Sequence, residues 1–492
     1  PRQLALGVFA HGPATLDPAL LDTVGDEQII QDLFEGLVEI DAELNVVPAL
    51  ARRWSVDESG LRYRFELRPD LRWSDGTPLR AHDFVFAWRR NLDPATGSAV
   101  ADLLGVIAGA EALQAGEATA PLGVRAVRDD LLEVELTTPV SYLLYLLADP
   151  IAFPQPEHAY RALGDACFSP QHLVCNGPFV VQRWHDGVEV LLERNPHYYG
   201  LAGDLDRVVL RFIEPSLAHY EQGLIDICRV ADRADIPQRY PHESFIRQFL
   251  STYFLSFDCS RPPFNDARLR RAFGQSVDRR ARVGNVWADI QNPADGGVIP
   301  PGMVGHSPEL ALPYDPATAR ALLAAVGELP PLTLATLPGS GGMALFLAAC
   351  WQRELGIEVH VRDGIPYDEI EAGLADGSIT LALVGGDAEF PDPHNAICGF
   401  AAGGRLAAGW SDARFDELIE RAAAAADQRE RLELYHRADR LLVAEAAAIA
   451  PLYYYRAFGV IRPGLQIAGA TGVVRGGALR LKRITTTATM VA

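Results

Sequence analysis

Residues 61–88 read LRYRFELRPDLRWSDGTPLRAHDFVFAW, and this stretch predicts a strand, a turn and a helix in succession. Leu61 to Leu67 alternates apolar and polar residues, which is typical of a half-buried strand. Gly76 tolerates positive φ and Pro78 blocks continuation, so a turn is expected between the two elements. From Asp83 to Arg90 apolar residues recur at helical spacing, with Asp83 as the predicted N-cap.

The same alternation of elements continues along the chain. Further strands are predicted at 131–136, 187–193 and 208–213, and helices at 26–38, 267–276, 315–325, from 411 or 412, and from 427. No repeat of solenoid period is present. These patterns predict α/β or α+β architecture. No Gly/Ser/Pro-rich linker divides the chain, which suits domains that exchange strands through several crossings.

Length and charge narrow the class of protein. A chain of 492 residues exceeds the size of one hydrophobic core, so two or three domains are expected. Hydrophobic residues make up 49% and charged residues 22%, values of an ordinary globular protein. The formal net charge of -20, without a long basic cluster, excludes nucleic acid as the main partner and disfavours anionic membrane surfaces.

Cysteines and apolar runs bear on the compartment. The six cysteines form no C-x-x-C pair and are expected to be buried free thiols, with a local Cys167–Cys175 disulfide as the alternative. No apolar run approaches the roughly 20 residues that a transmembrane helix needs. The chain begins at Pro1, so the missing secretory signal is expected to reflect a removed leader or a downstream start and does not argue for the cytoplasm.

The search for catalytic motifs finds none. There is no Walker A loop, no His-Glu-x-x-His and no nucleophile elbow, and Gly339-Ser340-Gly341 is interpreted as a flexible loop. Asp387, Glu389 and Asp392 do cluster within six residues. They could bind a metal, act as paired carboxylates, hold a ligand's ammonium group, or form a solvated acidic loop. No cofactor is predicted.

A family resemblance rests on five segments that occur in order between about Leu16 and Phe458. They are Gln31-Asp32-Leu33-Phe34-Glu35-Gly36-Leu37, Trp73-Ser74-Asp75-Gly76-Thr77-Pro78, Asp83-Phe84-Val85-Phe86-Ala87-Trp88, Asn176-Gly177-Pro178-Phe179 and Pro262-Pro263-Phe264-Asn265-Asp266. With them the chain resembles the oligopeptide/dipeptide-binding family (family 5) of extracellular solute-binding proteins of ABC importers, and most nearly its oligopeptide-binding branch.

The resemblance implies an α/β fold of the periplasmic-binding-protein type, with two lobes joined by a two-strand hinge plus an additional domain. Lobe I would comprise residues 1–34, 153–248 and 457–492, the additional domain II residues 35–152, and lobe III residues 249–456. Hinge closure of the lobes around a ligand is the expected working motion.

The resemblance also implies ligand contacts. Glu389 takes the position of an acid that pairs with a peptide's α-ammonium in a closed, dry cleft. The segment Leu383 to Asp387, which includes Gly385 and Gly386, is expected to be an edge strand that pairs with the peptide main chain. The remaining expected contacts are Asp22 to Val24, Val100, Arg229, Val230, Tyr367 and Tyr455. Tyr253 is added because alternate aromatic residues of a strand can line a cleft.

Several positions depart from the family pattern. Gly386 replaces a tryptophan, Val100 a tyrosine, and Leu374 and Leu383 arginines, while Ser251 and Asp387 replace a cysteine pair. The resemblance therefore predicts a larger, less basic and more acidic pocket.

Taken together, a periplasmic or membrane-anchored extracytoplasmic monomer is expected, which binds short peptides, delivers them to the importer's permease subunits and is not an enzyme. A non-peptide solute such as an opine-like compound, a nickel complex or haem is the alternative ligand, and a receptor role cannot be separated from transport by sequence. A metal-dependent hydrolase is the remote alternative.

Overall fold

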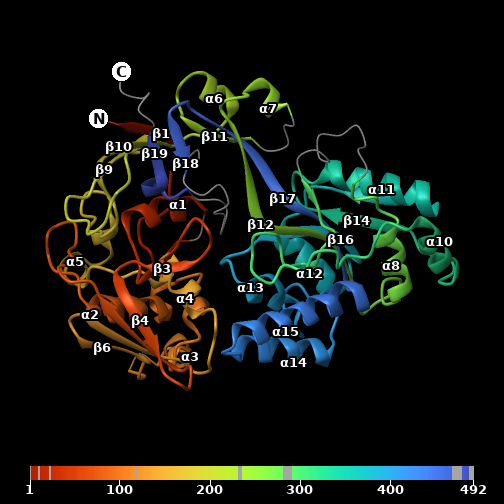
Figure 1. The fold of residues 1–492 in the computed structure, drawn as a ribbon, viewed down its shortest axis with the longest axis horizontal. Coiled ribbons are helices and arrows are strands. Elements are labelled where there is room, and N and C mark those ends of the chain that lie inside the picture. The colour runs from red at the N-terminus through yellow and green to blue at the C-terminus, as the bar shows by residue number, and fades with distance from the viewer. Residues whose placement is uncertain are drawn as a thin grey trace. The chain divides into compact units, whose positions relative to one another are not determined.

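The computed structural model describes residues 2–8, 12–21, 24–117, 119–230, 235–280, 291–467 and 479–486. They divide into two compact units (Figure 1). Unit 1 is drawn from Pro1–Ala231, Asp235–Arg247 and Phe458–Ala492, and unit 2 from Gln248–Ala457. The chain is of mixed α/β class. The predicted separation of residues 35–152 as a third domain stays a prediction.

Unit 1 is built on two sheets and a set of short helices. In the first sheet the strand order is β11-β1-β10-β9-β8, and in the second it is β4-β5-β7-β6. The strands are β1 (Gln3–Gly7), β4 (Ala51–Val56), β5 (Arg62–Leu67), β6 (Val124–Arg128), β7 (Leu131–Glu135), β8 (Phe179–His185), β9 (Glu189–Arg194), β10 (Arg207–Arg211) and β11 (Ile227–Val230). The helices are α1 (Val24–Leu33), α2 (Ala81–Leu92), α3 (Ala110–Gln114), α4 (Leu143–Leu146), α5 (Glu157–Leu163), α6 (Leu217–Glu221) and α7 (Ile236–Arg239).

Unit 2 is built on one sheet of strand order β15-β14-β16-β12-β17, with β13 paired to β17. The strands are β12 (Ser244–Phe257), β13 (Asn292–Pro293), β14 (Leu332–Thr336), β15 (Val359–Arg362), β16 (Leu381–Asp387) and β17 (Ile449–Ile461). Its helices are α8 (Ala267–Gln275), α10 (Pro316–Ala324), α11 (Gly341–Leu355), α12 (Tyr367–Asp376), α13 (Pro393–Ile397), α14 (Ala413–Ala424) and α15 (Gln428–Arg440). β12 and β17 continue into unit 1.

Most predicted elements are confirmed, and two helix starts or ends are wrong. The helix expected over 26–38 ends at Leu33, because the Leu33 carbonyl accepts from Gly177 N–H at 2.8 Å and the chain then turns away. At Gly36 a Cβ would lie 2.7 Å from the Phe153 ring, so this residue permits a close approach. Asp83 is not the N-cap of α2 but its third residue, where its carboxylate accepts from Arg80 N–H at 2.8 Å.

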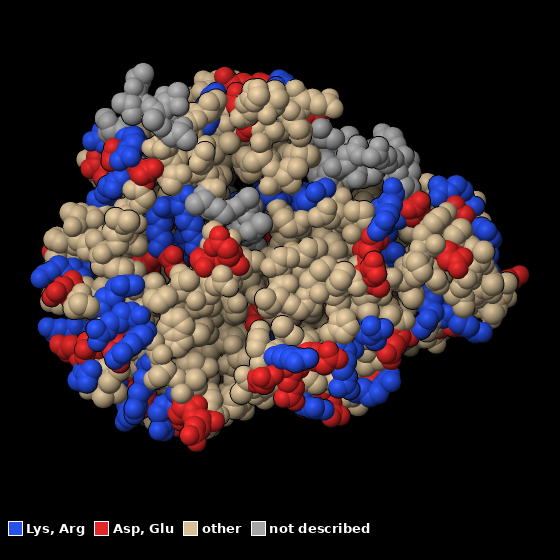
Figure 2. Space-filling view, viewed as in Figure 1, with Lys and Arg blue, Asp and Glu red and all other residues tan. Residues whose placement is uncertain are grey.

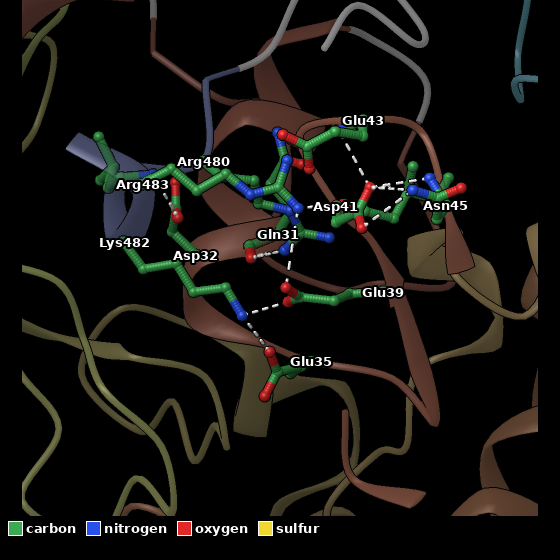
Figure 3. A network of polar contacts seen from close by, with 12 residues as sticks. Gln31, Asp32, Glu35, Glu39, Asp41, Glu43, Asn45, Arg480, Lys482 and Arg483 are labelled. Carbon is green, nitrogen blue, oxygen red and sulfur yellow. Dashed lines mark hydrogen bonds and ion pairs between the residues drawn. The ribbon is translucent and has the colours of Figure 1, made fainter. Parts of the chain in front are cut away.

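The C-terminal segment 479–486 belongs to unit 1 and lies against α1. It contains β19 (Ile484–Thr486), which pairs with β18 (Leu465–Ile467), and its Leu481 is completely buried in the core of the unit. Figure 3 shows the Lys482 side chain pointing between Glu35 and Glu39. Lys482 Nζ donates to Glu35 Oε1 at 2.5 Å and also pairs with Glu39. The small hairpin β2 (Val38–Ile40) and β3 (Val46–Pro48) carries Glu39.

Three further expectations concern the cysteines, membrane-spanning helices and surface charge. All six cysteines are free, with Cys167 and Cys175 both buried, so the alternative of a disulfide between them is wrong. Among the described elements, no helix combines the length and apolar character that crossing a bilayer requires. On the face shown in Figure 2, basic side chains lie interspersed with acidic ones and form no continuous basic surface.

Candidate functional site

The predicted contacts of unit 2 gather on β16 and its neighbours. β16 pairs antiparallel with β12 along its whole length, from Leu381 opposite Phe257 to Asp387 opposite Ser251. Its parallel ladder with β14 covers only Ala382 and Leu383, because β14 ends at Thr336. β16 was expected to be an edge strand from Leu383 onward. At Leu383, however, it has a paired strand on each side. From Val384 to Asp387, however, no ladder with another described strand forms on the side opposite β12.

The sequence of β16 explains this arrangement. Its first four residues, Leu-Ala-Leu-Val, are buried, as expected for a strand covered on both faces. Gly385 is half-buried, and Gly386 and Asp387 are exposed. The main chain of this second half is therefore accessible, and small residues leave room beside it. A row of main-chain groups at a strand edge is able to pair with an extended peptide.

The two glycines of β16 have different surroundings. A Cβ at Gly385 would lie 2.6 Å from the Tyr253 ring, so the ring of β12 covers this glycine directly. A Cβ at Gly386 would meet no heavy atom within 4 Å. The position at which the family pattern has a tryptophan is thus an open one.

An aromatic group continues from Gly385 across the sheet. The Tyr253 ring stacks on Tyr453 at 4.8 Å with 9° between the planes, and it lies 5.9 Å from Tyr455. Tyr455 in turn lies 5.0 Å from Phe249. Tyr253 and Tyr455 are half-buried at the margin of the unit 2 core. The structure thus brings together Tyr253, Tyr455 and the glycines of β16.

Glu389 lies two residues beyond the end of β16, on an ordered loop. Ala388 N–H donates to Leu250 O at 2.8 Å, and Glu389 N–H donates to Asn395 Oδ1 at 2.8 Å. The Glu389 side chain is exposed, so its expected burial in a dry cleft is not present in this structure. Asp387 is also exposed. Two carboxylates therefore stand at the accessible end of β16, an arrangement that favours a cationic group over an anion.

The third member of the acidic cluster has a structural role. Asp392 is fully buried, forms an ion pair with Arg431 and caps α13, accepting from His394 N–H at 2.9 Å. Burial and the Arg431 charge lower the pKa of His394 to about 4, so this imidazole is neutral near pH 7. Across the described residues, no group of three or more His, Cys, Asp or Glu is placed to hold a metal ion.

The remaining predicted residue of unit 2 is Tyr367, which begins α12. Its ring lies 5.8 Å from the guanidinium carbon of Arg405, and Arg405 pairs with Glu371 at 2.9 Å. α12 packs on β16. Leu374 and Leu383, which stand where the family pattern has arginines, are both buried apolar residues.

The predicted contacts of unit 1 are distributed over separate elements. Arg229 and Val230 end β11, paired with Gly459 and Phe458, and Arg229 is exposed. Val100 is half-buried and packs against the core of the unit. Asp22 lies outside the described residues, and Val24 is the first residue of α1. The structure therefore groups the predicted residues of unit 2 but does not group those of unit 1.

Sequence reasoning missed two groups beside the acidic loop. Asn395 holds the Glu389 main chain, and Arg431 anchors Asp392 from α15. The Asp392-Pro393 pair is an N-cap and N1 signature that could have indicated α13 and thus the position of Asn395. No sequence pattern around Arg431 indicated its contact with Asp392. A cavity of about 530 Å³ in unit 1, lined in part by Phe86, Arg89 and Tyr160, was also not predicted.

Comparison with known proteins identifies the family. Residues 45–407 match the description "Bacterial extracellular solute-binding proteins, family 5 Middle". The chain belongs to this family. Because its members are binding proteins, the chain is a binding protein and not an enzyme.

Individual relatives extend the match over nearly the whole chain. The probable deoxycholate-binding periplasmic protein YgiS of Escherichia coli is 33% identical over 477 residues, covering 92% of this chain and 88% of that protein. The periplasmic oligopeptide-binding protein OppA of Escherichia coli is 30% identical over 485 residues, with 93% and 88% covered.

Solved structures agree with this fold. The unliganded open form of the periplasmic murein tripeptide-binding protein MppA superposes with a TM-score of 0.85 at 26% identity, covering 99% of this chain and 97% of that one. The OppA structure from Burkholderia pseudomallei gives a TM-score of 0.77 at 27% identity, with 99% of each chain covered. The expected periplasmic-binding-protein fold is confirmed, and the family is extracytoplasmic.

Proposed function

We propose that this protein binds short peptides outside the cytoplasm and delivers them, as a monomer, to the membrane permease of an ABC importer. The proposed hinge is formed by β12 and β17, the strands that continue from one unit into the other, and closure about it would retain the ligand. A tether to the membrane by a lipid anchor is one form of this extracytoplasmic location.

The observation that carries the proposal is the accessible second half of β16 beside Glu389. A peptide main chain pairing with Gly385 to Asp387 would be bound without reference to its side chains. Its α-ammonium group would be received by Glu389, because a carboxylate at the end of the strand offers a charge-assisted hydrogen bond. Asp22, Val24, Val100, Arg229, Val230, Tyr253, Tyr367 and Tyr455 are the further proposed contacts.

Isothermal titration calorimetry with free and N-acetylated di- to pentapeptides tests this assignment. We expect the parent protein to prefer the free amine. Glu389→Gln should keep the fold and weaken binding of the free-amine peptides by about 1.5–3 kcal/mol, since a neutral amide replaces the charged acceptor. Binding that ignores acetylation would refute the proposed role of Glu389.

A second ligand class has one specific observation in its favour. A relative at 33% identity bears the name of a deoxycholate-binding protein, and deoxycholate is an apolar anion. The exposed carboxylates Asp387 and Glu389 oppose this ligand, because they repel its negative charge. A titration with deoxycholate beside the peptide series separates the two. Tight binding of deoxycholate, together with no detectable binding of any peptide, would refute the peptide proposal in favour of deoxycholate.

A further inference from the structure

The loop that carries Glu389 is held by a chain of contacts reaching into the core of unit 2. The β16 ladder ends at Asp387 opposite Ser251, and the Ala388 N–H bond to Leu250 O is the last contact of this kind. The next residue, Glu389, donates its main-chain N–H to Asn395 Oδ1 at 2.8 Å. A side-chain amide thus continues the support of the main chain at the point where the strand ends.

Asn395 is itself fixed by α13. It is the third residue of this helix, and its N–H donates to Asp392 O at 3.0 Å. Asp392 caps the helix and Pro393 occupies its first position, where a missing N–H costs nothing. Asn395 is only half-buried, so it can be replaced without opening the core.

α13 is in turn anchored to α15 by a buried ion pair. Arg431 is 3% exposed and donates to Asp392, which is 0% exposed. Its guanidinium lies 5.1 Å from the Tyr435 ring, and Tyr435 Oη lies 3.0 Å from His394 Nδ1. Leaving either partner of a buried ion pair without the other is strongly destabilising, so this pair strongly determines the position of α13.

We propose that Asn395 is a positioning residue for recognition of the ligand amine: its amide oxygen holds the Glu389 main chain where the carboxylate meets the ligand, and the Arg431–Asp392 pair holds Asn395. This inference rests on the proposed function. An exposed glutamate on an untethered loop would lose main-chain freedom on binding, and this loss of entropy opposes binding. The Asn395 contact removes part of that cost before the ligand arrives.

Two variants separate the acceptor from the bulk of the side chain. Asn395→Ala removes the acceptor, and Asn395→Asp keeps an oxygen in its place. Asn45→Ala, at an exposed asparagine of the turn before β3, is the matched control. Each is compared with the parent in two measurements: amide hydrogen exchange of residues 388–390 without ligand, and calorimetric titration with tri-, tetra- and pentaalanine carrying free or acetylated N-termini.

We expect Asn395→Ala to accelerate exchange in 388–390 and to weaken free-amine binding roughly 2- to 10-fold, the scale of one hydrogen bond, while leaving acetylated peptides unchanged. Asn395→Asp should restore both, and Asn45→Ala should match the parent. Unchanged exchange, or equal losses for free and acetylated peptides, would overturn the inference. A parent without amine preference would refute the proposed function and with it this role, while the exchange measurement would still report whether Asn395 holds the loop.

Discussion

Asp439 in α15 is a buried carboxylate whose second oxygen, Oδ2, has no hydrogen-bond partner among the described residues. Its Oδ1 accepts from Val298 N–H at 2.9 Å. Burial raises the pKa of Asp439 to about 7, against the opposing hydrogen bonds from the Val298 and Ile299 N–H groups. In the unfolded chain an aspartate titrates near pKa ~3.9. Between about pH 4 and 7 the folded state therefore holds a proton that the unfolded state has already released. As a result, the free energy of unfolding falls as the pH rises through this range.

The Asp439→Asn variant removes this titration. Its free energy of unfolding should increase relative to the parent as the pH rises from about 4 to about 7, by roughly 1–3 kcal/mol. Urea denaturation at several pH values measures the difference, and Asp32, whose pKa burial also raises to about 7, cancels because both proteins contain it. Asp315→Asn should show the opposite trend, and at pH values below about 4, since the Thr318 hydrogen bonds lower the pKa of Asp315. A pH-independent difference for Asp439→Asn would contradict the argument.

At the scale of the element, β16 depends on a glycine that no propensity rule would favour in a strand. Gly385→Ala places a methyl group against the base of the Tyr253 ring, so the ring must leave its stack on Tyr453. We expect a loss of about 1–3 kcal/mol in unfolding free energy, as for overpacking in general. Thermal unfolding and near-ultraviolet circular dichroism report the loss of stability and the moved ring.

The next residue supplies the control for this strand. Gly386→Ala puts the same methyl group into open space, so its stability and its aromatic dichroism should remain those of the parent. If both alanine variants behave alike, strand propensity and not the Tyr253 contact explains the effect.

Element types could be predicted better than element boundaries. The Asp315-Pro316 and Asp427 starts were correct because N-cap chemistry is local: Asp315 and Asp427 each accept a main-chain N–H three residues ahead. The end of α1 could not be predicted in the same way, because the Leu33 carbonyl accepts a hydrogen bond from Gly177 N–H, more than a hundred residues away in the sequence. The neighbours of β16 were missed for a similar reason, because strand pairing is not visible in a strand's own pattern.

At the scale of the whole molecule, the C-terminal segment was the part that the sequence left without interpretation. The structural role of this segment depends on residues far away in the sequence. Lys482, the one lysine of the chain, contacts Glu35 and Glu39, which lie more than 440 residues earlier. The candidate site likewise depends on contacts between residues that are distant in the sequence. Glu389 could be placed by family resemblance, whereas Asn395 and Arg431 support it through contacts that only the folded chain reveals.

Replacing Lys482 by methionine tests how far this distant segment stabilises unit 1. The Lys482 side chain is 11% exposed and Glu35 is 1% exposed, so the variant removes the cation paired with the buried Glu35 carboxylate, while Glu39 keeps its pair with Arg483. Burial alone would raise the pKa of Glu39, but Lys482, Arg480 and Arg483 together outweigh it and lower that pKa to about 2. The pair therefore contributes stability above the unfolded glutamate pKa of ~4.3, and this contribution is lost as the pH falls toward 2.

We expect Lys482→Met to lower the unfolding free energy by about 3–5 kcal/mol at pH 7, the cost of removing one partner of a buried pair. The deficit should shrink as the pH falls from about 6 to about 3, because protonated glutamates no longer need the cation. Arg53→Met breaks the exposed pair with Glu66 and should leave stability unchanged, since solvent screens that contact. Chemical denaturation of the three proteins across this pH range measures the deficit in unfolding free energy. A deficit that does not vary with pH would mean that Lys482 acts through packing of its aliphatic stem and not through its charge.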